Sequence, residues 1–113
     1  MAGLLLLALS ALAGCGQKET VPISQLIASD TQNPELLEAF GDRLDFLSHD
    51  RALMAKEMRA SGFELKNRGV GCGAWELPEN PKRTRAFVQF CEAENGSVVY
   101  TRYGISRKSM TYD

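Results

Sequence analysis

The chain has 113 residues, 13 basic and 14 acidic side chains and one histidine, which give a formal net charge of −1. This balance argues against the basic surface that nucleic-acid-binding proteins use, so we expect no nucleic-acid partner. The length is enough for one small domain but not for two.

The first segment, residues 1–14, carries no charge, and its apolar block from Leu4 to Ala13 is about ten residues long. A membrane-spanning helix needs roughly 20 apolar residues, so this block is too short to span a bilayer. Its length is typical of the apolar core of a secretory signal peptide, about 7 to 15 residues, which precedes small residues at a cleavage site. We therefore expect residues 1–14 to be a signal peptide.

The tetrapeptide Leu12-Ala13-Gly14-Cys15 at the end of this block resembles the lipobox of bacterial lipoproteins. The resemblance implies that the Cys15 thiol receives a diacylglyceryl group, that the chain is cut before it, and that fatty acid such as palmitate acylates the new amino terminus. Two or three acyl chains hold a protein firmly on a membrane, whereas one holds it marginally. Gly16 after the cysteine resembles the pattern sorted to the outer membrane, so we expect an envelope protein that faces the periplasm.

The remaining cysteines, Cys72 and Cys91, form an even pair if Cys15 carries lipid. A disulfide is expected between them in an oxidising periplasm, where it would close a loop of about 20 residues and contribute about 3 kcal/mol. A zinc site needs about four ligands at close spacing, and His49 is far from both cysteines in the sequence, so we expect no metal and no other cofactor.

The first half of the chain after the tether (residues 15–22) has a helical pattern. A brief helix is expected near residues 24–29, and Asn33 and Pro34 then have the residue types of a helix start. Apolar residues follow at alternating steps of three and four as far as Met58, which predicts one long or kinked helix over Pro34–Ser61. The alternative is a helical hairpin broken at residues 48–50, with Ser48 as the cap of the second helix. Gly62 predicts the helix end.

The second half is rich in β-branched and aromatic residues and predicts an antiparallel sheet of two to three strands. Residues 86–93 and 98–105 flank Asn95-Gly96, which is a strong signal for a two-residue hairpin turn. With that turn, Val88 faces Tyr103 and Phe90 faces Thr101 on the apolar side. Residues 71–77 form the candidate third strand. The fold class expected for residues 23–113 is a single α+β domain in which the helix packs on this small sheet.

Catalysis has little support in the sequence, and we expect no enzyme activity. Ser48, His49 and Asp50 are consecutive, which favours a capping cluster over a catalytic triad. Paired carboxylates such as Glu35 and Glu38 lie one turn apart on the exposed side of the helix and are interpreted as a solvated face.

These features predict a small membrane-anchored lipoprotein that binds an envelope protein or has a structural, accessory role. Aromatic residues and arginine are enriched where interfaces carry binding energy, so the candidate contact residues are Trp75, Phe87, Tyr100 and Arg102. The alternative for each of these four residues is a place in the core. The Asn-Pro-Glu-Leu-Leu helix start after a lipobox is similar to exclusion lipoproteins that plasmids and other mobile elements encode for conjugation. A third alternative is an envelope hydrolase or its inhibitor.

Overall fold

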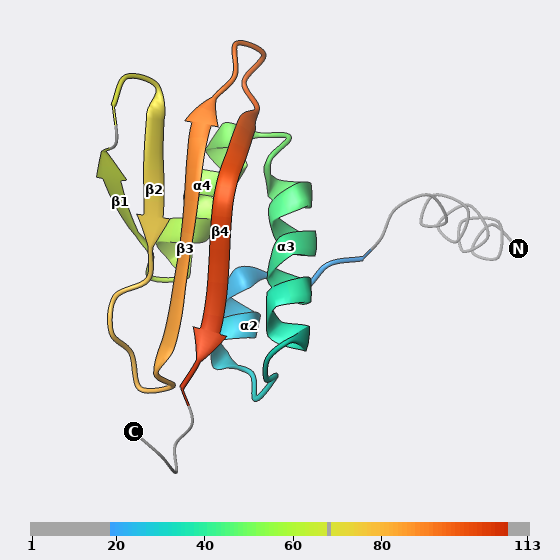
Figure 1. The fold of residues 1–113 in the computed structure, drawn as a ribbon. Coiled ribbons are helices and arrows are strands. Elements are labelled where there is room, and N and C mark those ends of the chain that lie inside the picture. Colours follow the sequence, from blue (N-terminus) through green and yellow to red (C-terminus); the bar gives the residue numbers. More distant parts are fainter. Residues whose placement is uncertain (1–18, 68, 109–113) are drawn as a thin grey trace, which may run out of the picture.

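The computed structural model describes residues 19–67 and 69–108, which form three helices followed by four strands (Figure 1). The elements are α2 (Ile23–Ala28), α3 (Glu35–Leu47), α4 (Arg51–Ala60), β1 (Glu64–Asn67), β2 (Cys72–Glu76), β3 (Thr84–Glu92) and β4 (Val98–Arg107). The expected signal peptide, Cys15 and tether residues 15–18 lie outside the described residues. No helix in the described part of the chain is both long and apolar enough to cross a bilayer.

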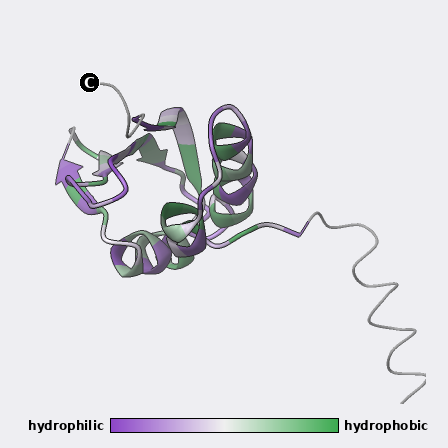
Figure 2. Cartoon of the chain, turned by 90° about the horizontal axis from the view of Figure 1, so that it is seen from below, coloured by the Kyte–Doolittle hydropathy of each residue, from purple (hydrophilic) through white to green (hydrophobic). Residues whose placement is uncertain are grey.

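The four strands form one antiparallel sheet in the order β1-β2-β3-β4, and the three helices cover the same face of it (Figure 1, Figure 2). The chain is therefore α+β, as expected from the sequence. The sheet has one strand more than predicted, because β1 pairs with β2 in the register Leu65↔Trp75. The missed strand is short and fully exposed, and three of its four residues, Glu64, Lys66 and Asn67, are of types depleted in strands.

The prediction of a single long or kinked helix over Pro34–Ser61 is wrong, because the helix is interrupted between α3 and α4. At the break, the Val98 amide donates to the Ser48 carbonyl and the Arg51 amide donates to the Gly96 carbonyl, both at 2.9 Å. A continuous helix would use these same groups of Ser48 and Arg51 in its own ladder. The tip of the β3–β4 hairpin therefore binds the turn and favours the break.

The helical-hairpin alternative located the break correctly at residues 48–50 but assigned the wrong cap. Asp50, not Ser48, caps α4, because its carboxylate accepts hydrogen bonds from the amides of Ala52 and Leu53. At the start of α3, the N-cap position is Pro34 and no side chain caps the helix, so Asn33 does not have its expected role. The end of α4 is as predicted: Gly62 has φ +91°, and the Phe63 amide donates to the Met58 carbonyl in the last turn of the helix.

The β3–β4 hairpin has the predicted register in its part distant from the turn, with the pairs Ala86↔Ile105, Phe87↔Gly104, Val88↔Tyr103 and Gln89↔Arg102. Nearer the turn the predicted register is wrong, because Phe90 pairs with Tyr100 and Cys91 pairs with Val99. Thr101 is an extra residue between two paired positions, which constitutes a β-bulge. The loop covers residues 93–97 instead of two residues, and Gly96 within it has φ +85°.

The helices and the sheet enclose a single hydrophobic core. Its buried residues are Ile23, Leu26, Leu36, Phe40, Leu44, Leu47, Met54, Met58, Phe63, Trp75, Ala86, Val88, Phe90, Val98 and Ile105. Full burial of one such large side chain stabilises the fold by about 1.5–3 kcal/mol, which makes this core the main source of stability.

Gly41 allows α3 to lie close to β4. A Cβ at this position would be 2.6 Å from the hydroxyl oxygen of Tyr103 and 3.2 Å from its Cζ. The Tyr103 ring contacts Phe40 at a centroid distance of 6.1 Å and Tyr100 at 5.5 Å. A residue that is a weak helix former is thus present in α3 because an aromatic ring of the sheet occupies the space of its side chain.

The short helix α2 is held at its N-terminal end by an ion pair from the other two helices. The Arg43 guanidinium of α3 donates through Nε to Glu57 of α4 at 2.8 Å, and Glu57 Oε2 also accepts from the Ile23 amide at 3.0 Å. Arg43 Nη1 donates to the Thr20 hydroxyl at 2.9 Å. A carboxylate therefore lies at the positive end of the α2 dipole, and the chain before α2 is fixed to α3.

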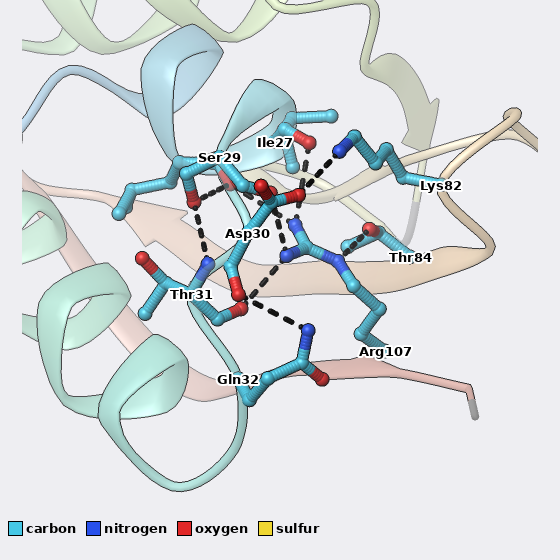
Figure 3. A network of polar contacts seen from close by, with 9 residues as sticks. Ile27, Ser29, Asp30, Thr31, Gln32, Lys82, Thr84 and Arg107 are labelled. Carbon is cyan, nitrogen blue, oxygen red and sulfur yellow. Dashed lines mark hydrogen bonds and ion pairs between the residues drawn. The ribbon is translucent and has the colours of Figure 1, made fainter. Parts of the chain in front are cut away.

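The C-terminal end of α2 is held by Arg107 from the last strand (Figure 3). Arg107 Nη2 donates to the carbonyls of Leu26 and Ile27, and Nη1 donates to those of Ser29 and Thr31, at distances from 2.7 to 3.2 Å. The remaining donor, Nε, bonds the hydroxyl of Thr84 at 3.0 Å. All five guanidinium N–H groups are used, so this residue, only 9% exposed, has no unpaired donor.

Candidate interaction surface

One face of the sheet is left without a helix by the described residues (Figure 1). Alternation along each strand decides which side chains lie on it. We call this the open face, and its residues on the two central strands are Cys72, Ala74 and Glu76 of β2 with Arg85, Phe87, Gln89 and Cys91 of β3. The two edge strands add Glu64 and Lys66 of β1 and Val99, Arg102, Gly104 and Ser106 of β4.

An aromatic ring with an arginine over it lies on the open face. The Arg102 guanidinium carbon is 5.6 Å from the centroid of the Phe87 ring, within the range of a cation–π contact. Gly104 pairs with Phe87, and a Cβ on Gly104 would be 2.8 Å from the ring. The ring therefore lies over the glycine of the neighbouring strand, half-buried, with Arg102 exposed next to it.

The four residues predicted as a contact surface do not all lie on one face of the sheet. Phe87 and Arg102 lie on the open face, but Trp75 is 3% exposed and belongs to the core, where it stacks on Phe90. Tyr100 lies on the side of the sheet that faces the helices. The extra residue Thr101 exchanges the two faces of β4 for the residues between the bulge and the turn, and Tyr100 is one of them. Half of the predicted surface thus forms packing between the layers.

Tyr100 makes its polar contact with a helix. Its hydroxyl donates to the carboxylate of Asp45 in α3. Burial, the hydrogen bond to Asp45 and the nearby negative charges raise the pKa of Tyr100 to about 12. The phenol is therefore neutral at physiological pH, and its function is to join α3 to β4.

The predicted disulfide between Cys72 and Cys91 is confirmed. The two residues are directly paired on β2 and β3, and the sulfur atoms are bonded at 2.04 Å. The bridge lies on the open face and is half-buried. It cross-links two neighbouring strands of that face.

A hollow of about 530 Å³ lies next to Phe87, at the end of the open face near the β2–β3 loop. It is lined by Glu76, Leu77, Glu79, Asn80, Arg83, Thr84, Arg85, Ala86, Phe87 and Lys108. This hollow was not predicted from the sequence. Alternation along β3 would have grouped Arg85, Phe87 and Gln89 on one face, but only the pairing of strands shows that the β2–β3 loop borders them.

The Ser48-His49-Asp50 run lies in the turn between α3 and α4. Asp50 caps α4, and the Ser48 hydroxyl donates to the Asp45 carbonyl at 2.9 Å, so both have local structural roles. His49 is exposed in the turn between the two helices. No group of three or more His, Cys, Asp or Glu side chains in residues 19–67 and 69–108 is arranged to hold a metal ion.

Comparisons with protein-family models, curated proteins and solved structures find no match to this chain.

Proposed function

We propose that this chain is a lipid-anchored envelope protein that binds a protein partner through the open face of its sheet. The anchor is proposed at Cys15, on the lipobox Leu12-Ala13-Gly14-Cys15. The observation that carries the choice of surface is the open face itself, which presents Phe87 under Arg102 beside a hollow of about 530 Å³.

The chemistry of the open face suits a protein partner. Aromatic rings and arginines supply most of the binding energy at protein interfaces, where they fill or border pockets on the partner. The ring of Phe87 is already held by Gly104 and by Arg102, so little conformational entropy is lost when a partner covers it. The basic residues of this face, Lys66, Arg85 and Arg102, outnumber its acidic residues, Glu64 and Glu76, by one, and this small positive surplus favours an acidic partner surface.

Site-specific photo-crosslinking in the native envelope tests the proposal. A photoreactive amino acid replaces Gln89 or Ser106 on the open face, and Glu38, an exposed residue of α3, serves as the matched control. We expect an adduct of defined mass from the first two positions and not from Glu38. The substitution Phe87→Ala is expected to remove the adduct formed at Gln89 while the protein remains folded. An identical adduct pattern from Glu38 would refute the choice of surface.

A further inference from the structure

Three exposed apolar side chains lie on the segments that supply the Arg43–Glu57 ion pair and its neighbours, on the helical side of the domain. The Arg43 guanidinium carbon is 4.8 Å from the centroid of the Phe46 ring. Leu53 precedes Glu57 by one turn on the same side of α4. Val21 follows Thr20, whose hydroxyl is bonded to Arg43. We call Val21, Phe46 and Leu53 the helical patch; their exposed fractions are 42%, 47% and 36%.

The helical patch lies where the anchored end of the chain meets the domain. Thr20 is five residues after Cys15, and five residues of fully extended chain span about 17 Å. Thr20 itself is fixed, because Arg43 holds its hydroxyl and Glu57 holds the amide of Ile23 shortly after it. Residues 19–22, which precede α2, run beside α3 and away from the sheet (Figure 1, Figure 2).

From this geometry we infer that the helical patch contacts the phospholipid surface and that the open face is directed to the aqueous compartment. The inference rests on the proposed lipid at Cys15 and adds an orientation to it. With about 17 Å of chain between the lipid and Thr20, the domain surface nearest to Thr20 is held at the headgroup region.

The chemistry of the helical patch agrees with a bilayer as its occupant. Apolar and aromatic side chains gain free energy when they enter the interface between headgroups and acyl chains. The charges of Arg43 and Glu57 neutralise each other, so their burial at this surface adds no net charge. Two exposed carboxylates also lie near the corner where α3 ends and α4 begins, and both are engaged within the domain: Asp45 accepts from the Tyr100 hydroxyl of β4, and Asp50 accepts from the amides of Ala52 and Leu53. The contact is made at this corner.

Quenching by nitroxide lipids tests the orientation. The full chain is expressed in bacteria, and its envelope form is reconstituted into vesicles of phosphatidylethanolamine and phosphatidylglycerol that contain nitroxide-labelled lipid. An environment-sensitive fluorophore is attached at Phe46→Cys or, as the matched control, at Ser106→Cys, which is exposed on the open face. The native pair Cys72 and Cys91 is oxidised and does not react with the label.

We expect several-fold stronger quenching at Phe46→Cys than at Ser106→Cys, and the same at Leu53→Cys, which provides a second reporter if Phe46→Cys folds poorly. Equal quenching in a protein that floats with the vesicles overturns the orientation and leaves the anchor intact. A chain that neither incorporates labelled fatty acid at Cys15 nor floats with the vesicles overturns both. A signal at Phe46→Cys that follows protein density and not nitroxide content assigns the helical patch to a second copy of the chain, which also overturns the inference.

Discussion

Replacement of Arg107 is the most direct test of how β4 stabilises α2. The guanidinium donates to four carbonyls and one hydroxyl and is almost fully buried. In Arg107→Met, these acceptors lose their donor while much of the side-chain volume remains. The Leu26 carbonyl also accepts from the amide and the hydroxyl of Ser29, at 3.3 and 2.9 Å, so it retains partners. The carbonyls of Ile27 and Thr31 depend more strongly on Arg107.

The expected loss is about 3 kcal/mol of unfolding free energy. A hydrogen bond from a charged donor contributes about 1.5–3 kcal/mol, and the five bonds are not additive because they share one side chain. For a domain of this size, about 3 kcal/mol lowers the midpoint of thermal unfolding by about 15 °C. Arg107→Lys is expected to lose most of the same free energy, because one ammonium has three donors and cannot reach acceptors on both sides of the fork.

Denaturant unfolding followed by Trp75 fluorescence measures this effect, since Trp75 is the single tryptophan and is buried. Arg85→Met, at an exposed arginine of β3, is the matched control and is expected to change stability by less than about 0.5 kcal/mol. If Arg107→Lys is as stable as the wild type, the forked geometry of the guanidinium does not contribute to stability, and the claim that Arg107 holds α2 through its five hydrogen bonds is wrong.

Three further perturbations test the fold. Gly41→Ala is expected to destabilise by about 1–2 kcal/mol despite its better helix propensity, because the new Cβ would lie 2.6 Å from the Tyr103 hydroxyl; Tyr103→Phe in the same chain should recover part of the loss in a double-mutant cycle, and a more stable Gly41→Ala protein would contradict the packing argument. The second perturbation is a change of pH, which acts through Glu57. Burial raises the pKa of this carboxyl, but hydrogen bonds from Arg43 and the Ile23 amide outweigh burial and hold the pKa below its ordinary value of 4.5. Its contribution is therefore present above about pH 4.5 and lost as pH falls through the lower folded-state pKa, so acid titration of stability should be steeper in the wild type than in Glu57→Gln, and parallel curves would show that the ion pair is unimportant. Reduction of the Cys72–Cys91 bridge, whose partners are 19 residues apart, should cost about 3 kcal/mol in denaturant unfolding, and an unchanged midpoint with reductant would count against its structural role.

Local sequence signals predicted those elements whose conformation depends on neighbouring residues. Asn95-Gly96 located the hairpin, and Gly62 located the end of α4, because a positive φ is a local property of glycine. The α3–α4 break was harder to predict. The apolar spacing continues through it in helical phase, and the groups that bind the turn, Gly96 and Val98, come from the hairpin about 45 to 50 residues later.

Local patterns in the sequence predict the α+β class and the positions of most elements, because periodicity and turn residues are properties of neighbouring residues. The pairing of Cys72 with Cys91 was predicted on the expectation that Cys15 carries lipid, which leaves two of the three cysteines. Which side chains share a surface depends instead on the three-dimensional pairing of the strands. The bulge at Thr101 turned Tyr100 toward the helices, and strand pairing placed Trp75 in the core and Phe87 beside Arg102. A shift of one residue in a strand exchanges its two faces, so a contact surface on a sheet depends on pairings between strands that are distant in the sequence.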